Sequence, residues 1–232
     1  MESVYDATAQ AFALLFTGDD SLWTLVNTSF LVSVQAVLYI TPPALVLAFT
    51  LVYLRFPGRR LLISIFHSLL AMPAIVVGLV LYLLFSRAGA FGDLQLLFTQ
   101  TAMVIGQMLL AFPIVVALGH AALQATDRVA WETARTLGAS RVKGMLSVMH
   151  DARFGLMTAL LTAFGRVISE VGCALIVGGS ILHHSRNITT AIKAQADQGA
   201  FAEGIALGVV LSILSLILSI SLNTVNNRLQ HV

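Results

Sequence analysis

The sequence predicts an all-α fold, a polytopic membrane helix bundle with about five transmembrane helices, an N-terminal interfacial helix and a helical cytoplasmic segment. The first observation behind this prediction is composition: of 232 residues, 58% are hydrophobic and only 10% are charged. An ordinary soluble domain carries roughly 25% charged residues, so this chain lacks the polar surface that water requires. The second observation is that the apolar residues gather in five long stretches separated by polar connections.

Each of the five stretches is long enough to cross a bilayer, which takes about 20 mostly apolar residues. In chain order they are Ser21 to Leu54, Leu61 to Phe85, Leu96 to His120, Phe154 to about Val177, and Gly204 to about Asn223. Residues 1–20 precede them, and their apolar part is too short to span, so we expect an interfacial helix there. No internal repeat or linker is visible, so residues 1–232 are predicted to form a single transmembrane domain.

The basic residues of the connections predict an orientation, because Lys and Arg gather on the cytoplasmic side of a membrane. Nine of them fall in the first connection, the third connection and the C-terminal tail: Arg55, Arg59, Arg60, Arg128, Arg135, Arg141, Lys143, Arg153 and Arg228. Three fall on the other side: Arg87, Arg186 and Lys193. The N-terminus is therefore predicted to lie outside and the C-terminus in the cytoplasm.

The longest cytoplasmic connection, residues 121–153, is predicted to form two short helices. Asp127 can cap the first helix, which would end at Gly138, since glycine readily adopts the left-handed backbone that closes many helices. Ser140 can then cap a second helix. Ala130, Ala134 and Leu137 would give the first helix a small apolar stripe that lets another surface approach closely. The segment is therefore predicted to be a docking surface, against the alternative of an ordinary interfacial loop.

The stretch E-T-A at residues 132–134, followed by Gly138, resembles the E-A-A-x-x-x-G signature of permease subunits of ABC importers. The chain departs from that pattern at Thr133, and residues 148–151 read V-M-H-D where many members carry I-x-L-P. The resemblance implies that residues 127–151 form a coupling helix, which docks on a cytoplasmic ATPase. The residues implied at this contact are Glu132, Ala134, Gly138, Ala139 and Ser140.

The fourth apolar stretch contains the only charges expected inside the membrane, Arg166 and Glu170. Four residues apart, they would be neighbours on one helical face, together with Ser169 and two threonines. A lone charge at the bilayer centre costs about 2.5–3.5 kcal/mol even on insertion scales, so intramembrane charges point to function. Arg166, Ser169 and Glu170 are predicted to line a pathway or gate, and a structural ion pair within the bundle is the alternative.

The residues around this pair narrow the resemblance. F-G-R-V-I-S-E-V-G at residues 164–172 resembles the F-x-R-x-x-x-E-x-G segment of permeases for sulfate, molybdate and tungstate. The stretches V-G-G-S-I and I-T-T-A-I, at residues 177–181 and 188–192, look most like tungstate permeases. The resemblance implies an importer subunit for a tetrahedral oxyanion, with tungstate first and molybdate or sulfate as alternatives.

The partners follow from the resemblance. They are a cytoplasmic ABC ATPase dimer, a second copy of this chain and an extracytoplasmic oxyanion-binding protein, in the cytoplasmic membrane of a bacterium or archaeon. The chain has no G-x-x-x-x-G-K-[ST] loop, so we expect no cofactor of its own and expect ATP to be bound by the partner subunit.

The last apolar stretch carries a stripe of small residues suited to close helix packing. Its members are Gly204, Gly208, Ser212, Ser215 and Ser219. A homodimer seam or pore wall is one interpretation of the stripe, and packing within one subunit is the other.

The outer connection from Ser180 to Glu203 contains His183 and His184, which invite a metal interpretation. Adjacent residues do not share a helical face and no third ligand is evident, so no metal site is predicted. A docking surface for the external binding protein is the preferred interpretation.

Other classes of protein fit less well. A serine hydrolase would want G-x-S-x-G, which is absent, and no apolar stretch holds the aspartates of an intramembrane aspartyl protease, so no enzyme is predicted. An ATP-independent channel or a scaffold subunit remains an alternative. The basic residues follow the membrane rule, so nucleic acid binding is not expected.

Overall fold

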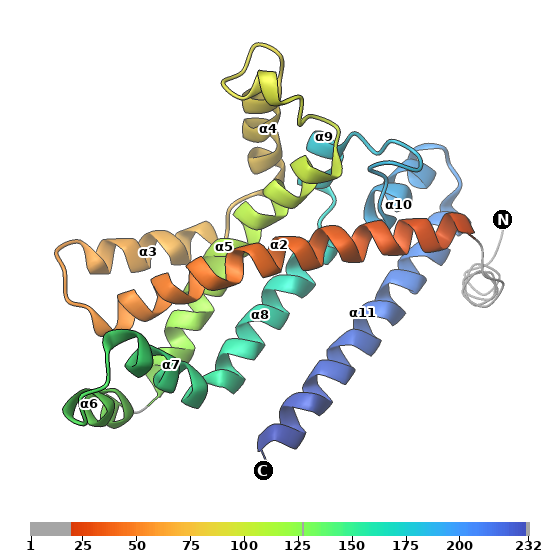
Figure 1. Ribbon diagram of the computed structural model, residues 1–232. Coiled ribbons are helices and arrows are strands. Elements are labelled where there is room, and N and C mark those ends of the chain that lie inside the picture. The colour runs from red at the N-terminus through yellow and green to blue at the C-terminus, as the bar shows by residue number, and fades with distance from the viewer. Residues whose placement is uncertain (1–19, 127, 231–232) are drawn as a thin grey trace. The chain divides into compact units, whose positions relative to one another are not determined.

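The computed structural model describes residues 20–126 and 128–230 (Figure 1). These residues form ten α-helices, α2 to α11, and one short 3-10 helix, η1, with no strand among them. The expected interfacial helix lies in residues 1–20 and so falls outside the described residues except for Asp20, and the expected cap Asp127 falls outside them too.

The five apolar stretches correspond to helices, but two of them are broken. The continuous ones are α2 (Asp20–Tyr53), α5 (Gln100–Ala125) and α11 (Phe201–Gln230). The second stretch forms α3 (Arg59–Leu69) and α4 (Ala74–Phe85), and the fourth forms α8 (Arg153–Ile168) and α9 (Gly172–Gly178). By length and composition α2 and α5 can each cross a membrane, and each broken pair passes the same test when counted as one span.

Proline accounts for the first break but not for other positions where it occurs. Pro73 precedes α4 in an extended conformation, where its missing N–H costs nothing because the first helical N–H groups lack partners anyway. Pro42 and Pro43 lie inside α2, which continues through them. Just before them the Thr41 hydroxyl donates to the Val37 carbonyl at 2.6 Å, a local hydrogen bond that keeps this polar group satisfied among apolar residues.

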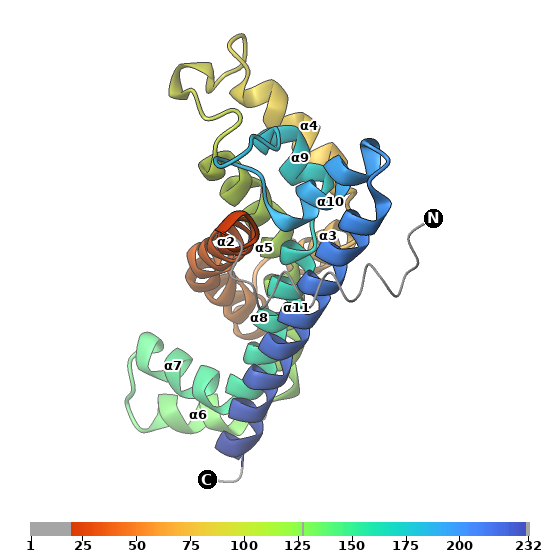
Figure 2. The same cartoon turned by 90° about the vertical axis from the view of Figure 1, so that its right-hand side faces the viewer.

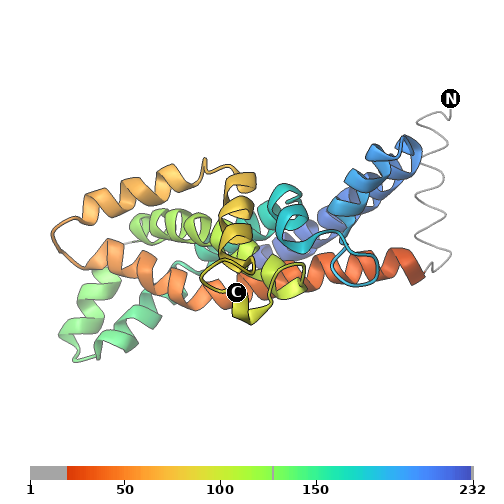
Figure 3. The same ribbon diagram turned by 90° about the horizontal axis from the view of Figure 1, so that it is seen from above.

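The described chain divides into two compact units. The first contains residues 20–36, 73–107 and 165–230. Within it α4 packs along α9, and α10 (Ile188–Asp197) packs on the N-terminal part of α11 (Figures 1 and 3). One core of this unit joins the start of α2 to these last helices through Leu22, Val26, Ile188, Ala206 and Val210.

Glycines let α9 approach its neighbours in the first unit. A Cβ on Gly78 of α4 would lie 3.0 Å from the Cys173 Cα, and a Cβ on Gly106 of α5 would lie 2.6 Å from the Cys173 Sγ. Cys173 is buried and forms no disulfide. It is a packing residue whose surroundings leave no room for further side-chain atoms.

The connection from Ser180 to Glu203, which is predicted to lie outside the cell, contains the helix α10. Asn187 begins this helix with a capping box: its Oδ1 accepts the Thr190 N–H at 2.9 Å, and the Thr190 hydroxyl accepts the Asn187 N–H at 3.0 Å. The Ile188 N–H donates to the Ser29 hydroxyl of α2 at 2.9 Å. These buried hydrogen bonds fix the start of α10 in the first unit.

The second unit contains residues 37–72 and 108–164. Its core joins α2, α5, α7 (Arg141–Asp151) and α8 through Ala48, Phe49, Leu123, Val148 and Leu156. The short helix α6 (Arg128–Thr136) lies beside α7, and the two form a helical hairpin at one end of this unit (Figure 2).

Candidate functional site

The hairpin of α6 and α7 is closed by glycine, as the sequence predicts. Gly138 has φ +83°, and two backbone bonds end the helix: Gly138 N–H to the Arg135 carbonyl at 3.2 Å, and Ala139 N–H to the Ala134 carbonyl at 2.9 Å. This is a Schellman ending, in which a left-handed residue satisfies the last helical carbonyls. The Ser140 hydroxyl then accepts the Lys143 N–H at 3.3 Å and caps α7. Both the break at Gly138 and the Ser140 cap are confirmed.

The hairpin rests on the rest of its unit through one aromatic cluster. The Trp131 ring lies with its centroid 5.2 Å from that of Phe49 and 5.4 Å from that of Tyr53, and the latter two rings stack at 4.7 Å. Gly144 of α7 makes room for the indole, because a Cβ there would lie 2.8 Å from the Trp131 ring. Sequence reasoning assigned no role to Trp131 or Gly144, since only the packing shows that they face each other.

The opposite side of the hairpin is open. Leu137 is 82% exposed, and Val129, Val142 and Leu146 are more than half exposed. Glu132 is exposed as well. The predicted stripe is divided: Leu137 faces out, whereas Ala130 packs against the core of its own unit and Ala134 is half-buried. The open surface is thus apolar at four positions, with a carboxylate among them.

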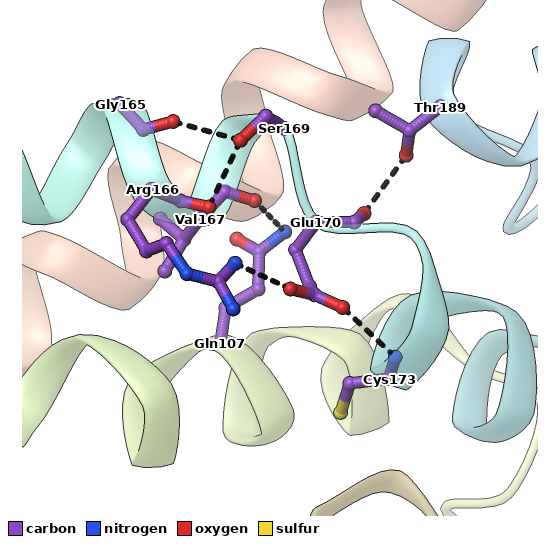
Figure 4. Close-up of polar contacts among 8 residues, drawn as sticks. All are labelled: Gln107, Gly165, Arg166, Val167, Ser169, Glu170, Cys173 and Thr189. Atoms are coloured by element: carbon purple, nitrogen blue, oxygen red, sulfur yellow. Dashed lines mark hydrogen bonds and ion pairs between the residues drawn. The ribbon is translucent and has the colours of Figure 1, made fainter. Parts of the chain in front are cut away.

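The charge pair of the fourth stretch forms, but not on one helical face. Helix α8 ends at Ile168, so Glu170 lies in the break before α9 and the helical geometry expected for the pair is wrong (Figure 4). The Arg166 Nη1 and Glu170 Oε2 lie 2.5 Å apart, and the other carboxylate oxygen accepts the Cys173 N–H at 3.2 Å. The Glu170 side chain is 6% exposed, against 43% for Arg166. The two charges therefore have different surroundings.

Two further residues hold the break in place. The Gln107 side chain of α5 donates to the Val167 carbonyl at 3.2 Å, and the Thr189 hydroxyl of α10 donates to the Glu170 carbonyl at 2.9 Å (Figure 4). One acceptor is a carbonyl in the last turn of α8 and the other lies in the break itself, where the regular helical hydrogen bonds are interrupted. Sequence reasoning missed Gln107 and Thr189, although a polar residue amid an apolar stretch was a usable signal for Gln107.

Several polar residues of the fourth stretch are exposed. In the first unit these are Arg166, near the end of α8, and Ser169, just after that end; in the second unit they are Thr158 and Thr162 of α8. The two threonine hydroxyls donate to carbonyls one turn earlier, at 3.0 and 2.8 Å. Cys173, in the same apolar stretch, is buried on α9.

Only part of the small-residue stripe of α11 packs against other described residues. Gly204 is buried against α10, where a Cβ would lie 3.7 Å from that of Gln195. At Gly208 no described atom lies within 4 Å of the position of a Cβ, and Ser212 is exposed with its hydroxyl bonded to the Gly208 carbonyl. Ser215 is half-buried. The N-terminal end of the stripe thus packs within the chain, whereas Gly208 and Ser212 have no such contact with the described residues.

Comparison with known proteins places these features in a family. Residues 40–231 match the model of the binding-protein-dependent transport system inner membrane component. The chain belongs to this family. It is 34% identical to the tungstate uptake system permease protein TupB of Campylobacter jejuni, over 99% of this chain and 95% of that protein. It is 38% identical to a probable anion ABC transporter permease of Haloferax volcanii, over 84% of this chain and 89% of that protein.

The fold is also that of solved transporters. A bacterial alginate ABC transporter, crystallised with an alginate-bound periplasmic protein, contains a chain that matches with a TM-score of 0.77. The match covers 97% of this chain and 86% of that one at 16% sequence identity, and so concerns the fold alone. In this permease, Glu132 is an exposed charged residue of the α6–α7 hairpin. The Arg166–Glu170 ion pair lies at the break between α8 and α9.

The predicted site residues of this permease lie in separate places. Glu132, Ala134, Gly138, Ala139 and Ser140 belong to the hairpin of the second unit, and Arg166, Ser169 and Glu170 lie at the break in the first unit. In the outer connection, His183 and His184 are exposed. Among the described residues, no three His, Cys, Asp or Glu side chains gather as metal ligands would.

Proposed function

We propose that this permease is the membrane-spanning subunit of an ATP-driven ABC importer for a tetrahedral oxyanion, and that the anion is tungstate. The observation that carries the proposal is the 34% identity to a tungstate uptake permease along nearly the whole of both chains. Molybdate and sulfate are the competing substrates, because the R-x-x-x-E-x-G segment resembles permeases for all three anions.

The open side of the hairpin would dock on a cytoplasmic ABC ATPase. Apolar side chains around Glu132 suit a groove with a basic or hydrogen-bonding wall, and the Schellman ending and aromatic cluster hold the hairpin rigid. ATP would be bound by that partner, so this chain would need no cofactor. Glu132, Ala134, Gly138, Ala139 and Ser140 are the proposed coupling residues.

The exposed polar surface at the end of α8, formed by Arg166 and Ser169 of the first unit, would face the transport pathway. Its one formal charge is the half-exposed Arg166, whose guanidinium favours divalent anions, and Ser169 lies beside it. Glu170, buried and bonded at both oxygens, would hold the arginine in place. A second copy of the chain would enclose the pathway from the other side, with Gly208 and Ser212 at or near the seam.

The location follows from the basic residues. The coupling hairpin would lie in the cytoplasm with the C-terminus, and the connection at residues 180–203 would lie outside with the N-terminus. The membrane would be the cytoplasmic membrane of a bacterium or archaeon. The outer connection, helix α10 included, would receive an extracytoplasmic oxyanion-binding protein.

ATP hydrolysis by the reconstituted permease–ATPase complex tests the proposal. The complex is supplied in turn with its binding protein loaded with tungstate, molybdate or sulfate. Stimulation by the tungstate-loaded protein is expected. Stimulation by only the molybdate-loaded or the sulfate-loaded protein would show that this anion, and not tungstate, is the substrate. Anion flux without any ATP requirement would favour a channel. No stimulation by any of the three would refute the oxyanion importer.

The coupling role of the hairpin gives a prediction with a matched control. Gly138→Val should lower stimulated ATP hydrolysis several-fold, because a β-branched residue is a conformational outlier at φ +83°. Gly58→Val is the control: Gly58 has φ +84°, and at both positions no described atom lies within 4 Å of a Cβ. Equal losses in the two variants would assign the effect to general strain and contradict a specific coupling role.

A further inference from the structure

A cavity of about 180 Å³, lined by both polar and apolar side chains, lies in the first unit, between the start of α2, the segment before α10, α10 itself and the start of α11. Helices α10 and α11 lie side by side (Figure 2), and both contribute lining residues. Its polar lining residues are Ser21, Thr24, His183, Arg186, Gln195 and Gln198. Water occupies roughly 30 Å³ per molecule in the liquid, so the cavity has room for one anion with four oxygens and some remaining water.

Arg186 is held at this cavity by its own loop. Its Nε donates to the Ser180 carbonyl at 3.1 Å and to the Ser180 hydroxyl at 3.2 Å, and the side chain is half-buried. Within the described residues its two terminal nitrogens make no hydrogen bond and no ion pair. The guanidinium thus lines the cavity with its direction fixed and its terminal N–H groups available. This paired geometry matches the oxygens of an oxyanion.

The rest of the lining also suits an anion. Every polar side chain in it can donate a hydrogen bond, and none is a carboxylate. Gln195 and Gln198 are three apart, so their amides face the same side of the end of α10. The acid of this helix, Asp197, does not line the cavity and is engaged by Lys193, with Nζ–O distances of 2.6 and 2.7 Å.

The loop adopts a costly conformation at this place. Ser180 and His183 both have positive φ, 50° and 60°, which non-glycine residues seldom adopt. Buried hydrogen bonds hold it: the Ser185 hydroxyl donates to the Gly178 carbonyl and accepts the Ile181 N–H. Backbone strain of this kind persists only where the surroundings enforce it, and it is common at ligand sites.

We infer that this cavity binds a divalent tetrahedral oxyanion, with Arg186 as the charged ligand and the Gln195 and Gln198 amides as further donors. The inference rests on the proposed function in one respect: the outer position of residues 180–203 makes this a receiving site, where the anion is held after it leaves the binding protein. No step of ATP hydrolysis is needed for binding at the site.

Equilibrium binding tests the site directly. Radiolabelled tungstate is titrated onto the purified permease–ATPase complex in nanodiscs, without binding protein and at constant ionic strength. Saturable binding is expected, weakened at least tenfold by Arg186→Gln and partly restored by Arg186→Lys. Lys193→Gln is the matched control, because it removes the same charge from the exposed side of α10 without touching the cavity lining.

A second variant tests the cavity without disturbing residues 180–187, whose conformation Arg186 helps to hold. Gln195→Leu removes one donor from the cavity and none of the hydrogen bonds that hold residues 180–187, and it should weaken binding several-fold. The inference is overturned if the wild-type complex shows no saturable binding. It is also overturned if Arg186→Gln binds like the wild type, or if Lys193→Gln loses as much affinity as Arg186→Gln, which would indicate general charge attraction.

ATP hydrolysis stimulated by the loaded binding protein separates this inference from the proposed function. If stimulation is present and binding does not depend on Arg186, the receiving site fails and the importer stands. If no oxyanion-loaded protein stimulates hydrolysis but Arg186-dependent binding is found, the importer fails and the anion site stands.

Discussion

At the scale of single residues, the Arg166–Glu170 pair shows that two partners in one ion pair can have different roles. Glu170 is buried and bonded to Arg166 and to the Cys173 N–H, so its charge is compensated at both oxygens. The Arg166 side chain remains 43% exposed near the end of α8. Burying a carboxylate is costly unless it is paired, so Arg166 stabilises the break as well as facing outward.

A double substitution separates these two roles. Arg166→Gln alone should lower the melting temperature of the purified complex, because it leaves the buried Glu170 carboxylate without its cation. Adding Glu170→Gln should recover most of that stability, since no buried charge remains. Uptake of oxyanion into proteoliposomes should stay lost in the double variant if Arg166 serves the pathway. Recovery of uptake together with stability would instead assign the pair a structural role.

At the scale of helices, the close packing of α9 depends on glycine. Gly78→Ala should destabilise the complex, because its Cβ would lie 3.0 Å from the Cys173 Cα and 3.2 Å from Ile176, and backbone cannot move aside cheaply. Thermal unfolding measures the effect, expected at about 1–3 kcal/mol. Gly165→Ala is the control, since no described atom lies within 4 Å of a Cβ there. Equal destabilisation by the two changes would contradict the packing argument.

Helix α11 offers a test of the homodimer seam. No described atom lies within 4 Å of a Cβ at Gly208, so a side chain there starts in open space, and Gly208→Leu should leave the melting temperature of the single subunit nearly unchanged. If a second copy packs on the stripe, the same change should lower the dimer fraction measured by light scattering and by cross-linking. A dimer fraction equal to that of the wild type would remove Gly208 from the seam.

Hydropathy was sufficient to locate the five apolar stretches. The hairpin could be predicted from a helix-ending glycine and a capping serine, because Gly138 and Ser140 act on neighbours within five residues. The break between α8 and α9 could not be predicted in this way. Two buried carbonyls at the break accept hydrogen bonds from Gln107 and Thr189, which lie 60 and 19 residues away from them in the sequence. Helix α10 was missed because its stability comes from a capping box and from buried contacts with α2 and α11.

At the scale of the whole molecule, the hairpin and the Arg186 cavity would lie on opposite sides of the proposed membrane. The hairpin lies between the third and fourth apolar stretches, and the Arg186 cavity lies between the fourth and fifth, so one crossing separates them in the chain. The proposed importer needs this arrangement, because the anion would be received on one side of the membrane and the ATPase would attach on the other.

Single cysteines test that orientation. Cys173 is the only cysteine and is 1% exposed, so the unmodified chain should not react with a membrane-impermeant thiol reagent. In intact cells His184→Cys should be labelled, whereas Ser140→Cys should be labelled only after permeabilisation, since both positions are exposed. The reverse pattern would invert the predicted orientation.

The aromatic cluster of Trp131, Phe49 and Tyr53 has a mechanical consequence. Atoms in contact repel steeply when pressed together, whereas pulling them apart is opposed only by the modest attraction between rings, about 0.5–1.5 kcal/mol per pair beyond their buried area. A partner that presses on α6 therefore moves Phe49 and Tyr53 with it, but a partner that lifts α6 can detach it from them. The contact between the hairpin and its unit would thus resist compression more strongly than separation. As the proposed coupling element, the hairpin would transmit a push from its partner better than a pull.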